Sequence, residues 1–205
     1  MKTVSKQYLH ISILSILFFS LFFIILSNKT ESQDAEKTYN IDAVHSAVFF
    51  RAKHLGVTYN YGRFNEFSGN ITLDESDISK SKVELVVKTA SVDSANAKRD
   101  QHLRSPDFFN VKQFPVITFN STKVSKKEGH DKTLEVTGDF ELHGVKKSIT
   151  VDVEITGKAN NPQVGEIIGF LATFDIKRSE YGFNFGLENI NDEIQITVSI
   201  EARVK

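Results

Sequence analysis

Strict alternation of apolar and polar residues is the feature that most constrains the fold of this chain. Ile194–Ala202 alternates at every position, and Leu134–Leu142 and Ile149–Ile155 repeat the pattern. In a β-strand successive side chains point to opposite faces, so each of these segments has one apolar and one solvated face. The pattern predicts antiparallel strands that enclose an apolar interior.

Five weaker runs bring the total to about eight strands. They are Val48–His54, Phe64–Leu73, Val83–Thr89, Val116–Val124 and Phe170–Ile176. Turn-forming residues separate the strands at Lys126–Gly129, His143-Gly144 and Asn160–Pro162. Such one-sided strands form either a sandwich of two sheets or one closed barrel, and eight strands make a barrel wide enough for side chains or one small ligand. The alternation alone does not choose between these two folds.

The first residues predict a targeting segment that is not part of the fold. Lys2 and Lys6 precede an apolar run over residues 9–26, and a polar segment follows it. This order is typical of an export signal, and a run of about 18 residues also has the length that crosses a bilayer. We therefore interpret residues 1–27 as a signal peptide or a retained N-terminal anchor, residues 28–38 as a linker and residues 39–205 as one domain.

Either alternative places the domain outside the cytoplasm. If the apolar segment is retained, residues 9–26 would hold the domain at a membrane.

Composition limits the chemistry that the chain can carry. It contains no cysteine, which excludes disulfides, thiolate metal sites and a cysteine nucleophile. Its formal net charge of -1 argues against a nucleic-acid partner. Its 17 phenylalanines suit a core or an apolar pocket, because aromatic side chains bring large apolar area with little flexibility.

Residues 94–110 interrupt the strand pattern. Ser94–Leu103 is rich in Ala, Lys, Arg, Asp and Gln and predicts a helix. Ser105-Pro106-Asp107 predicts a second helix start, since Ser can cap, Pro suits the first helical position and Asp suits the positive helix end. Phe108 and Phe109 follow, and we expect at least one of these rings to pack on the sheet.

A series of short motifs resembles the YceI-like family in the family's own order across Tyr39–Val204. The first part carries Ile41-Asp42, His45-Ser46, Val48-x-Phe50-x-x-x-His54, Gly62-Arg63-Phe64 and Phe67-Ser68-Gly69. The middle part carries His102–Val111 and Phe114-Pro115-x-Ile117-Thr118-Phe119-x-Ser121. The last part carries Gly138–Lys146, Gly169-Phe170, Arg178-Ser179-x-Tyr181-Gly182 and Asp192-Glu193-Ile194. Each motif alone is weak, but their order over the whole domain is specific.

The resemblance implies an all-β fold, an eight-stranded antiparallel lipocalin-like barrel with a short helical insertion around residues 94–110 and an elongated apolar tunnel. It implies an exported binding protein that holds a polyisoprenoid or isoprenoid-quinone-type lipid without catalysis, and no cofactor beyond that lipid. Family members also associate through barrel surfaces, which leaves a homodimer open. The stretch 57–61 is more polar and aromatic than is usual in the family, and we expect this difference at the tunnel mouth.

Strand parity predicts which side chains face the barrel interior. Small residues among the bulky ones, Ala52, Gly138 and Ala172, favour a channel over a filled core. Phe108 and Phe109 are predicted to form a lid over one end, with Phe119 facing the interior. The residues predicted to contact the ligand are Val48, Phe50, Ala52, His54, Phe64, Phe108, Phe109, Phe119, Val136, Phe140, Phe170, Phe174, Arg178, Ile196 and Val198.

Two polar residues of this set leave their roles open. His54 would either meet a ligand head group or serve as a hydrogen-bonded core or rim residue. An inward Arg178 needs a partner, for which Asp100, Asp107 and a ligand anion are the candidates.

Metal and catalytic signatures find little support. The histidines lie in separate segments without metal-ligand spacing, so we expect no metal site. The chain has neither a Gly-x-Ser-x-Gly elbow nor a phosphate loop. Two other functions stay open, a periplasmic small-molecule-modifying enzyme or stress factor that uses His54 and Arg178, and a structural module with a filled barrel.

Overall fold

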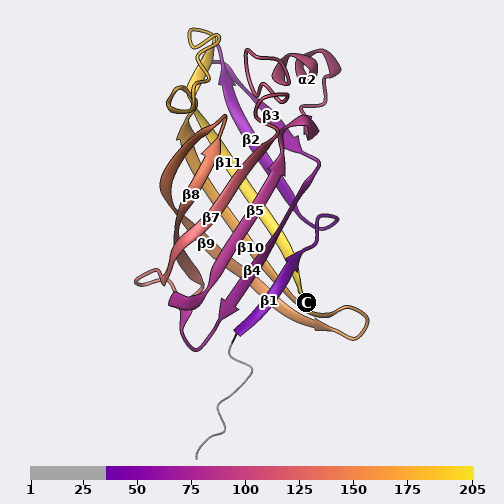
Figure 1. Cartoon of the computed structure of the whole chain (residues 1–205), viewed down its shortest axis with the longest axis vertical. Coiled ribbons are helices and arrows are strands. Elements are labelled where there is room, and N and C mark those ends of the chain that lie inside the picture. The colour runs from indigo at the N-terminus through magenta and orange to yellow at the C-terminus, as the bar shows by residue number, and fades with distance from the viewer. Residues whose placement is uncertain (1–35) are drawn as a thin grey trace, which may run out of the picture. The chain divides into compact units, whose positions relative to one another are not determined.

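Residues 36–205, which the computed structural model describes, form a closed antiparallel β-barrel (Figure 1). The predicted signal or anchor over residues 1–27 lies outside the described residues. The first strand begins at Glu36, so the last three residues of the predicted linker, 36–38, belong to the barrel. Every described strand and both hydrophobic clusters lie within Glu36–Val204, so this part of the chain holds a complete core of its own.

The barrel wall consists of hairpin-connected strands with short 3-10 turns between some of them. The strands are β1 (Glu36–Ile41), β2 (Ala47–His54), β3 (Thr58–Phe64), β4 (Phe67–Asp74), β5 (Lys82–Lys88), β6 (Val92–Asp93), β7 (Val116–Lys126), β8 (Thr133–Leu142), β9 (Val145–Asn161), β10 (Gly165–Lys177) and β11 (Ile190–Val204). The helical pieces are α2 (Ala97–Leu103) and the 3-10 turns η1 (Ile78–Lys80), η2 (Thr89–Ser91) and η3 (Arg178–Tyr181).

These segments combine into eight long strands, three of which are interrupted. β1 and β2 follow one another along β11, where Ala202 pairs with Ile41 and Ser199 pairs with Ala47. β4 and β3 run beside them in the same way, and β5 continues into β6. The pairing of β1 with β11 closes the ring and leaves no long open edge. The predicted eight-stranded antiparallel barrel is confirmed.

The strand boundaries differ from the predicted ones in the N-terminal half. The predicted strand Phe64–Leu73 breaks at residues 65–66, where the N–H of Asn65 binds the carbonyl of Ser91 at 3.1 Å. Most of β3 was not predicted as a strand. Its tyrosines, Tyr59 and Tyr61, are exposed, so the segment lacks the alternating apolar pattern that marks the other strands.

The insertion contains one short helix at the end of the barrel where β2 and β3 meet (Figure 1). α2 begins after Asn96, whose side-chain oxygen accepts a hydrogen bond from the N–H of Arg99 at 3.0 Å. The predicted second helix is wrong. The carbonyl of Ser105 instead accepts the N–H groups of Phe108 and Asn110, which makes a compact turn. Among residues 36–205, no helix has both the length and the apolar character needed to cross a membrane.

Candidate functional site

The interior of the barrel is hollow. A cavity of about 630 Å³ lies inside it, lined by apolar side chains from the strands and by residues of the insertion. Small-molecule sites typically occupy about 300–1,000 Å³. The cavity contradicts the alternative of a structural module with a filled barrel.

Aromatic rings on the inner wall confirm the hollow directly. Phe50, Phe119 and Phe174 point inward, yet each is only half-buried, whereas a filled core would cover them with neighbouring atoms. A Cβ atom on Gly62 would lie 2.2 Å from Cζ of Phe50, and one on Gly138 would lie 2.6 Å from Cζ of Phe119. Each ring therefore covers a glycine. The expected channel is present, but the ring of Phe119 takes the space above Gly138.

All of the residues predicted to contact a ligand line this cavity. They are Val48, Phe50, Ala52, His54, Phe64, Phe108, Phe109, Phe119, Val136, Phe140, Phe170, Phe174, Arg178, Ile196 and Val198. Strand parity therefore located the interior correctly, and contact with a ligand stays a prediction.

Sequence reasoning missed a group of polar side chains at the α2 end of the cavity. Asn60, Ser94 and Arg99 also line it. The guanidinium of Arg99 donates to Oγ of Ser94 at 2.7 Å, to the carbonyl of Ser94 at 2.6 Å and to Oδ1 of Asn60 at 3.3 Å. Parity with Phe64 could have identified Asn60, but Arg99 reaches the cavity only because the helix folds back over the barrel.

Phe109 attaches the insertion to the barrel wall. Its ring centroid lies 5.3 Å from that of Phe64 and 6.2 Å from that of Phe50, both in edge-to-face geometry. A third edge-to-face contact joins it to Phe183 at 5.4 Å, in the segment before β11. The ring thus joins β2, β3 and this loop across one end of the cavity.

Phe108 makes a second contact between the insertion and the loop before β11. It is buried, and its centroid lies 4.9 Å from His102 and 5.4 Å from Phe185. Nε2 of His102 lies 2.9 Å from Oδ2 of Asp107, which fixes the turn against the helix. His102, Phe185 and Tyr61 line the cavity and are also exposed, so the cavity reaches solvent at the α2 end.

The hydrogen-bond partners of Arg178 are backbone carbonyls, and neither Asp100 nor Asp107 is among them. The side chain is buried and donates to four backbone carbonyls at 2.9–3.0 Å, those of Phe183, Phe185, Ile190 and Asn191. Burial lowers the pKa of Arg178, but a guanidinium stays charged in proteins. Arg178 therefore holds the loop before β11 in place. The candidate partners Asp100 and Asp107 are wrong, and a contact with a ligand anion stays a prediction.

The comparison with known proteins agrees with the barrel and its insertion. A family model described as the YceI-like domain matches residues 39–202. The chain belongs to the YceI-like family. The Protein YceI of Salmonella arizonae is 39% identical over 167 residues, which are 82% of this chain and 86% of that protein.

Solved structures share the fold of this YceI-like protein. The YCEI protein of Campylobacter jejuni superposes with a TM-score of 0.67 at 34% identity, covering 75% of this chain and 90% of that one. A polyisoprenoid binding domain from Saccharophagus degradans superposes with a TM-score of 0.61 at 18% identity, covering 82% of this chain and 98% of that domain. At that identity the second similarity shows the fold alone.

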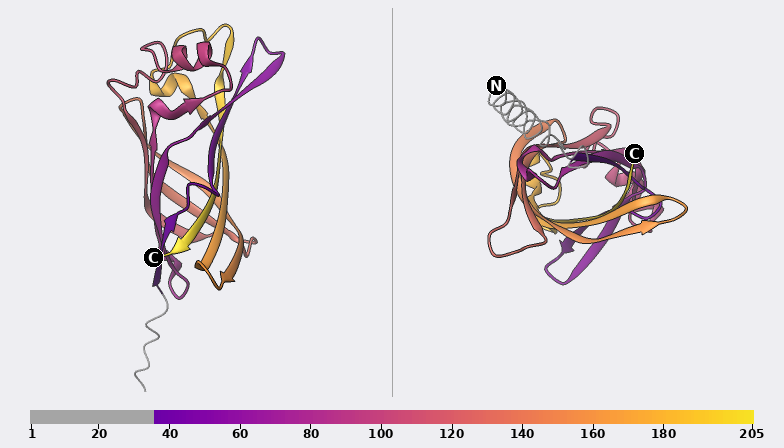
Figure 2. Two further views of the ribbon diagram at one scale, coloured as in Figure 1. Left: turned by 90° about the vertical axis from the view of Figure 1, so that its right-hand side faces the viewer. Right: turned by 90° about the horizontal axis from the view of Figure 1, so that it is seen from below.

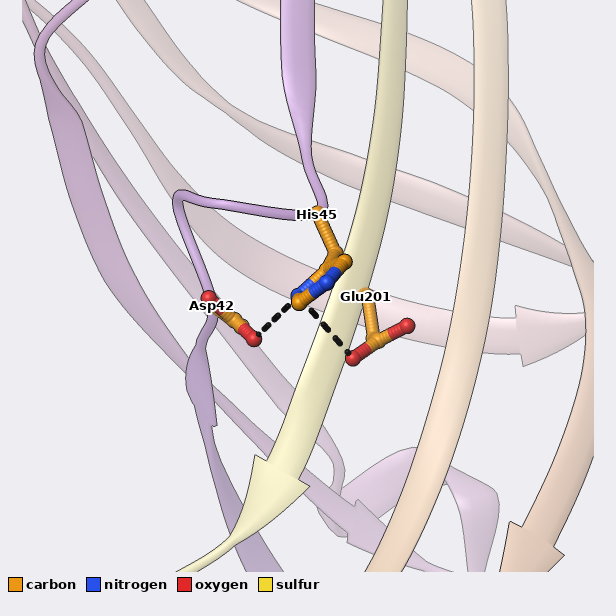
Figure 3. Close-up of side chains that lie close together, drawn as sticks. All are labelled: Asp42, His45 and Glu201. Atoms are coloured by element: carbon orange, nitrogen blue, oxygen red, sulfur yellow. Dashed lines mark hydrogen bonds and ion pairs between the residues drawn. The ribbon is translucent and has the colours of Figure 1, made fainter.

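A separate ionic cluster lies where this YceI-like barrel bends between β1 and β2. Nδ1 of His45 lies 2.8 Å from Oδ2 of Asp42 and 3.7 Å from Oε1 of Glu201 (Figure 3). The hydrogen bond from His45 lowers the pKa of Asp42. Arg203 forms ion pairs with both carboxylates and so offsets part of their negative charge. The cluster reads as an ion-pair network that fixes the bend, and the absence of a metal site stays a prediction.

Proposed function

We propose that this YceI-like protein is an exported carrier that holds a polyisoprenoid or isoprenoid-quinone-type lipid in its barrel and catalyses no reaction. The observation that carries the proposal is the apolar cavity of about 630 Å³. Each buried CH₂ contributes about 0.8 kcal/mol, so one five-carbon isoprene unit would contribute about 4 kcal/mol before the costs of association. A prenyl tail would therefore bind without a charged contact.

The polar end of the cavity gives the lipid an orientation. Arg99 and Asn60 lie beneath the insertion, where the cavity reaches solvent, and His54 lines the same end. The tail would lie along the apolar wall, and the head group would lie at the α2 end. The shared fold with the polyisoprenoid binding domain of Saccharophagus degradans supports this class of ligand.

Binding is better supported than catalysis. A small-molecule-modifying enzyme that used His54 and Arg178 would need the guanidinium for its substrate. Four N–H groups of the Arg178 guanidinium already donate to backbone carbonyls. Export is inferred from residues 1–27 alone, and sequencing the N-terminus of protein recovered from the periplasm tests both export and cleavage.

The test is native mass spectrometry of the purified protein, followed by lipid extraction, with two variants of one strand. Val198 is a half-buried wall residue that pairs with Val48 and Ala172, so Val198→Phe would place a ring in the cavity. Ser199 is exposed on the outer face, so Ser199→Phe is the matched control. We expect Val198→Phe to lose the lipid and Ser199→Phe to keep it.

Two outcomes would refute the proposal. One is a wild-type protein that is always free of ligand and takes up neither ubiquinone nor undecaprenyl phosphate. The other is equal lipid content in Val198→Phe and Ser199→Phe with the fold intact, because the lipid would then lie outside the barrel.

A further inference from the structure

Exposed apolar side chains gather on the β2–β3 hairpin and the loop beside it. Of the twelve large hydrophobic residues exposed in the described part of the chain, six lie here: Leu55, Val57, Tyr59, Tyr61, Phe185 and Leu187. The N–H of Leu55 binds the carbonyl of Asn189 at 2.7 Å, which joins the hairpin tip to that loop. In the left view of Figure 2 the hairpin is the purple arm that reaches past the rim at the α2 end.

Leu55, at the tip of the hairpin, occupies a turn position that disfavours leucine. Leu55 and Gly56 are the central residues of a β-turn, with φ of 50° and 68°, in which the N–H of Val57 donates to the carbonyl of His54. Turns with positive φ at both positions favour Asn or Gly, and leucine is disfavoured there. Leu55 is also 58% exposed and Val57 is 84% exposed, so contacts within the fold do not explain these apolar residues.

Basic and aromatic residues alternate on the outer face of the same hairpin. Arg51 pairs with Tyr61 across the strands, and Lys53 pairs with Tyr59. Cζ of Arg51 lies 4.5 Å and Nζ of Lys53 lies 5.7 Å from the ring centroid of Tyr59. Within residues 36–205 neither Arg51 nor Lys53 has an ion-pair partner. Tyrosine beside Lys or Arg, next to an apolar tip, is typical of surfaces that bind the headgroup layer of a lipid bilayer.

We propose that the β2–β3 hairpin tip, together with the loop around Phe185 and Leu187, docks on an anionic lipid bilayer. Leu55 and Val57 would enter the headgroup layer, and Arg51 and Lys53 would contact anionic headgroups. Tyr61 belongs to this surface and also lines the cavity, so docking would bring the open end of the cavity to the membrane. Docking itself does not depend on the proposed function. Its role, the exchange of lipid between bilayer and barrel, rests on the proposed function.

The chain has no tryptophan, which allows a single fluorescent reporter to be introduced. Val57→Trp places it at the hairpin tip, and Val164→Trp places it in the β9–β10 turn at the opposite end of the barrel. The experiment uses residues 35–205, which contain the complete barrel, because residues 9–26 would bind lipid by themselves. With vesicles of phosphatidylglycerol and phosphatidylcholine, we expect the tryptophan emission to shift to shorter wavelength and to be quenched by brominated lipid in Val57→Trp only.

Substitutions at the tip separate docking from folding. Leu55→Asn places a residue that tolerates positive φ in the turn, so it should raise the melting temperature by about 2–4 °C. It should still weaken vesicle binding, because it removes an apolar side chain from the tip. Val57→Asp should weaken binding about tenfold, whereas Val44→Asp, at a residue of matching exposure far from the tip, should not. Lys53→Gln should weaken binding to anionic vesicles about fivefold and leave binding to neutral vesicles unchanged.

Three results would overturn the docking surface. The first is no binding to anionic vesicles, and the second is binding that Val57→Asp leaves unchanged. The third is self-association in sedimentation that Val57→Asp abolishes, because the surface would then join two copies of the chain. Lipid content by native mass spectrometry is read separately, so vesicle binding by a barrel that never holds a lipid would refute the carrier function and leave docking intact.

Discussion

Replacing both Phe108 and Phe109 with alanine tests whether the insertion is a lid. Phe109 makes three edge-to-face contacts, and each such pair contributes about 0.5–1.5 kcal/mol. Phe108 adds the contacts of a buried ring with His102 and Phe185. We expect the double substitution to reduce the free energy that favours the closed position of the insertion over an open one by about 2–4 kcal/mol.

That loss converts into a change in the rate of ligand release. If opening limits release, about 2–4 kcal/mol corresponds to release that is about 30- to 1,000-fold faster. The barrel itself should remain folded, because domain stabilities are about 5–15 kcal/mol and the strand ladder does not include these two residues. The lid therefore predicts a large kinetic change in a folded protein.

The assay loads the protein with ubiquinone and follows its transfer to empty acceptor vesicles, with circular dichroism as the check on the fold. Phe114→Ala is the matched control. Phe114 lies between the insertion and β7, packs on His143 with centroids 4.3 Å apart, and does not line the cavity. We expect the double variant to release quinone rapidly and Phe114→Ala to release it at the wild-type rate.

The lid is refuted by an unchanged release rate and lipid content in the folded double variant. Equal acceleration by Phe114→Ala would also contradict it, because general loosening of the insertion would then explain both results.

Three further predictions concern stability. Arg178→Met should lower the free energy of unfolding by about 3–5 kcal/mol in denaturant titration, because it leaves four carbonyls without their donor. Gly62→Ala should cost about 1–3 kcal/mol by overlap with the ring of Phe50, and adding Phe50→Leu should recover part of that loss; strict additivity would contradict the overlap. The N–H and hydroxyl of Ser179 lower the pKa of Asp192, so this carboxylate stabilises the fold above the ordinary carboxyl pKa of about 4, and the contribution is lost as pH falls through the depressed value. Asp192→Asn should therefore flatten the acid side of the stability profile, and an unchanged acid slope would exclude this role.

The sequence by itself determined which faces of the strands are apolar. Period-two alternation marks which side chains share a face, because the pleat of a strand turns successive residues to opposite sides. Parity therefore assigns Val136, Phe170 and Ile196 to the interior, and each of them lines the cavity. Alternation did not reveal β3 as a strand, because its large rings, Tyr59 and Tyr61, are exposed and its inward positions include Asn60 and Gly62.

Only the tertiary structure decided how the ends of the barrel are built. The partners of Arg178 are backbone carbonyls, which carry no signature in the sequence, and Arg99 enters the cavity only because α2 folds back over it. The turn at Leu55 opposes its local preference, so no local rule could find it. Local periodicity fixes the faces of a strand, whereas the mouth depends on contacts between segments that are distant along the chain.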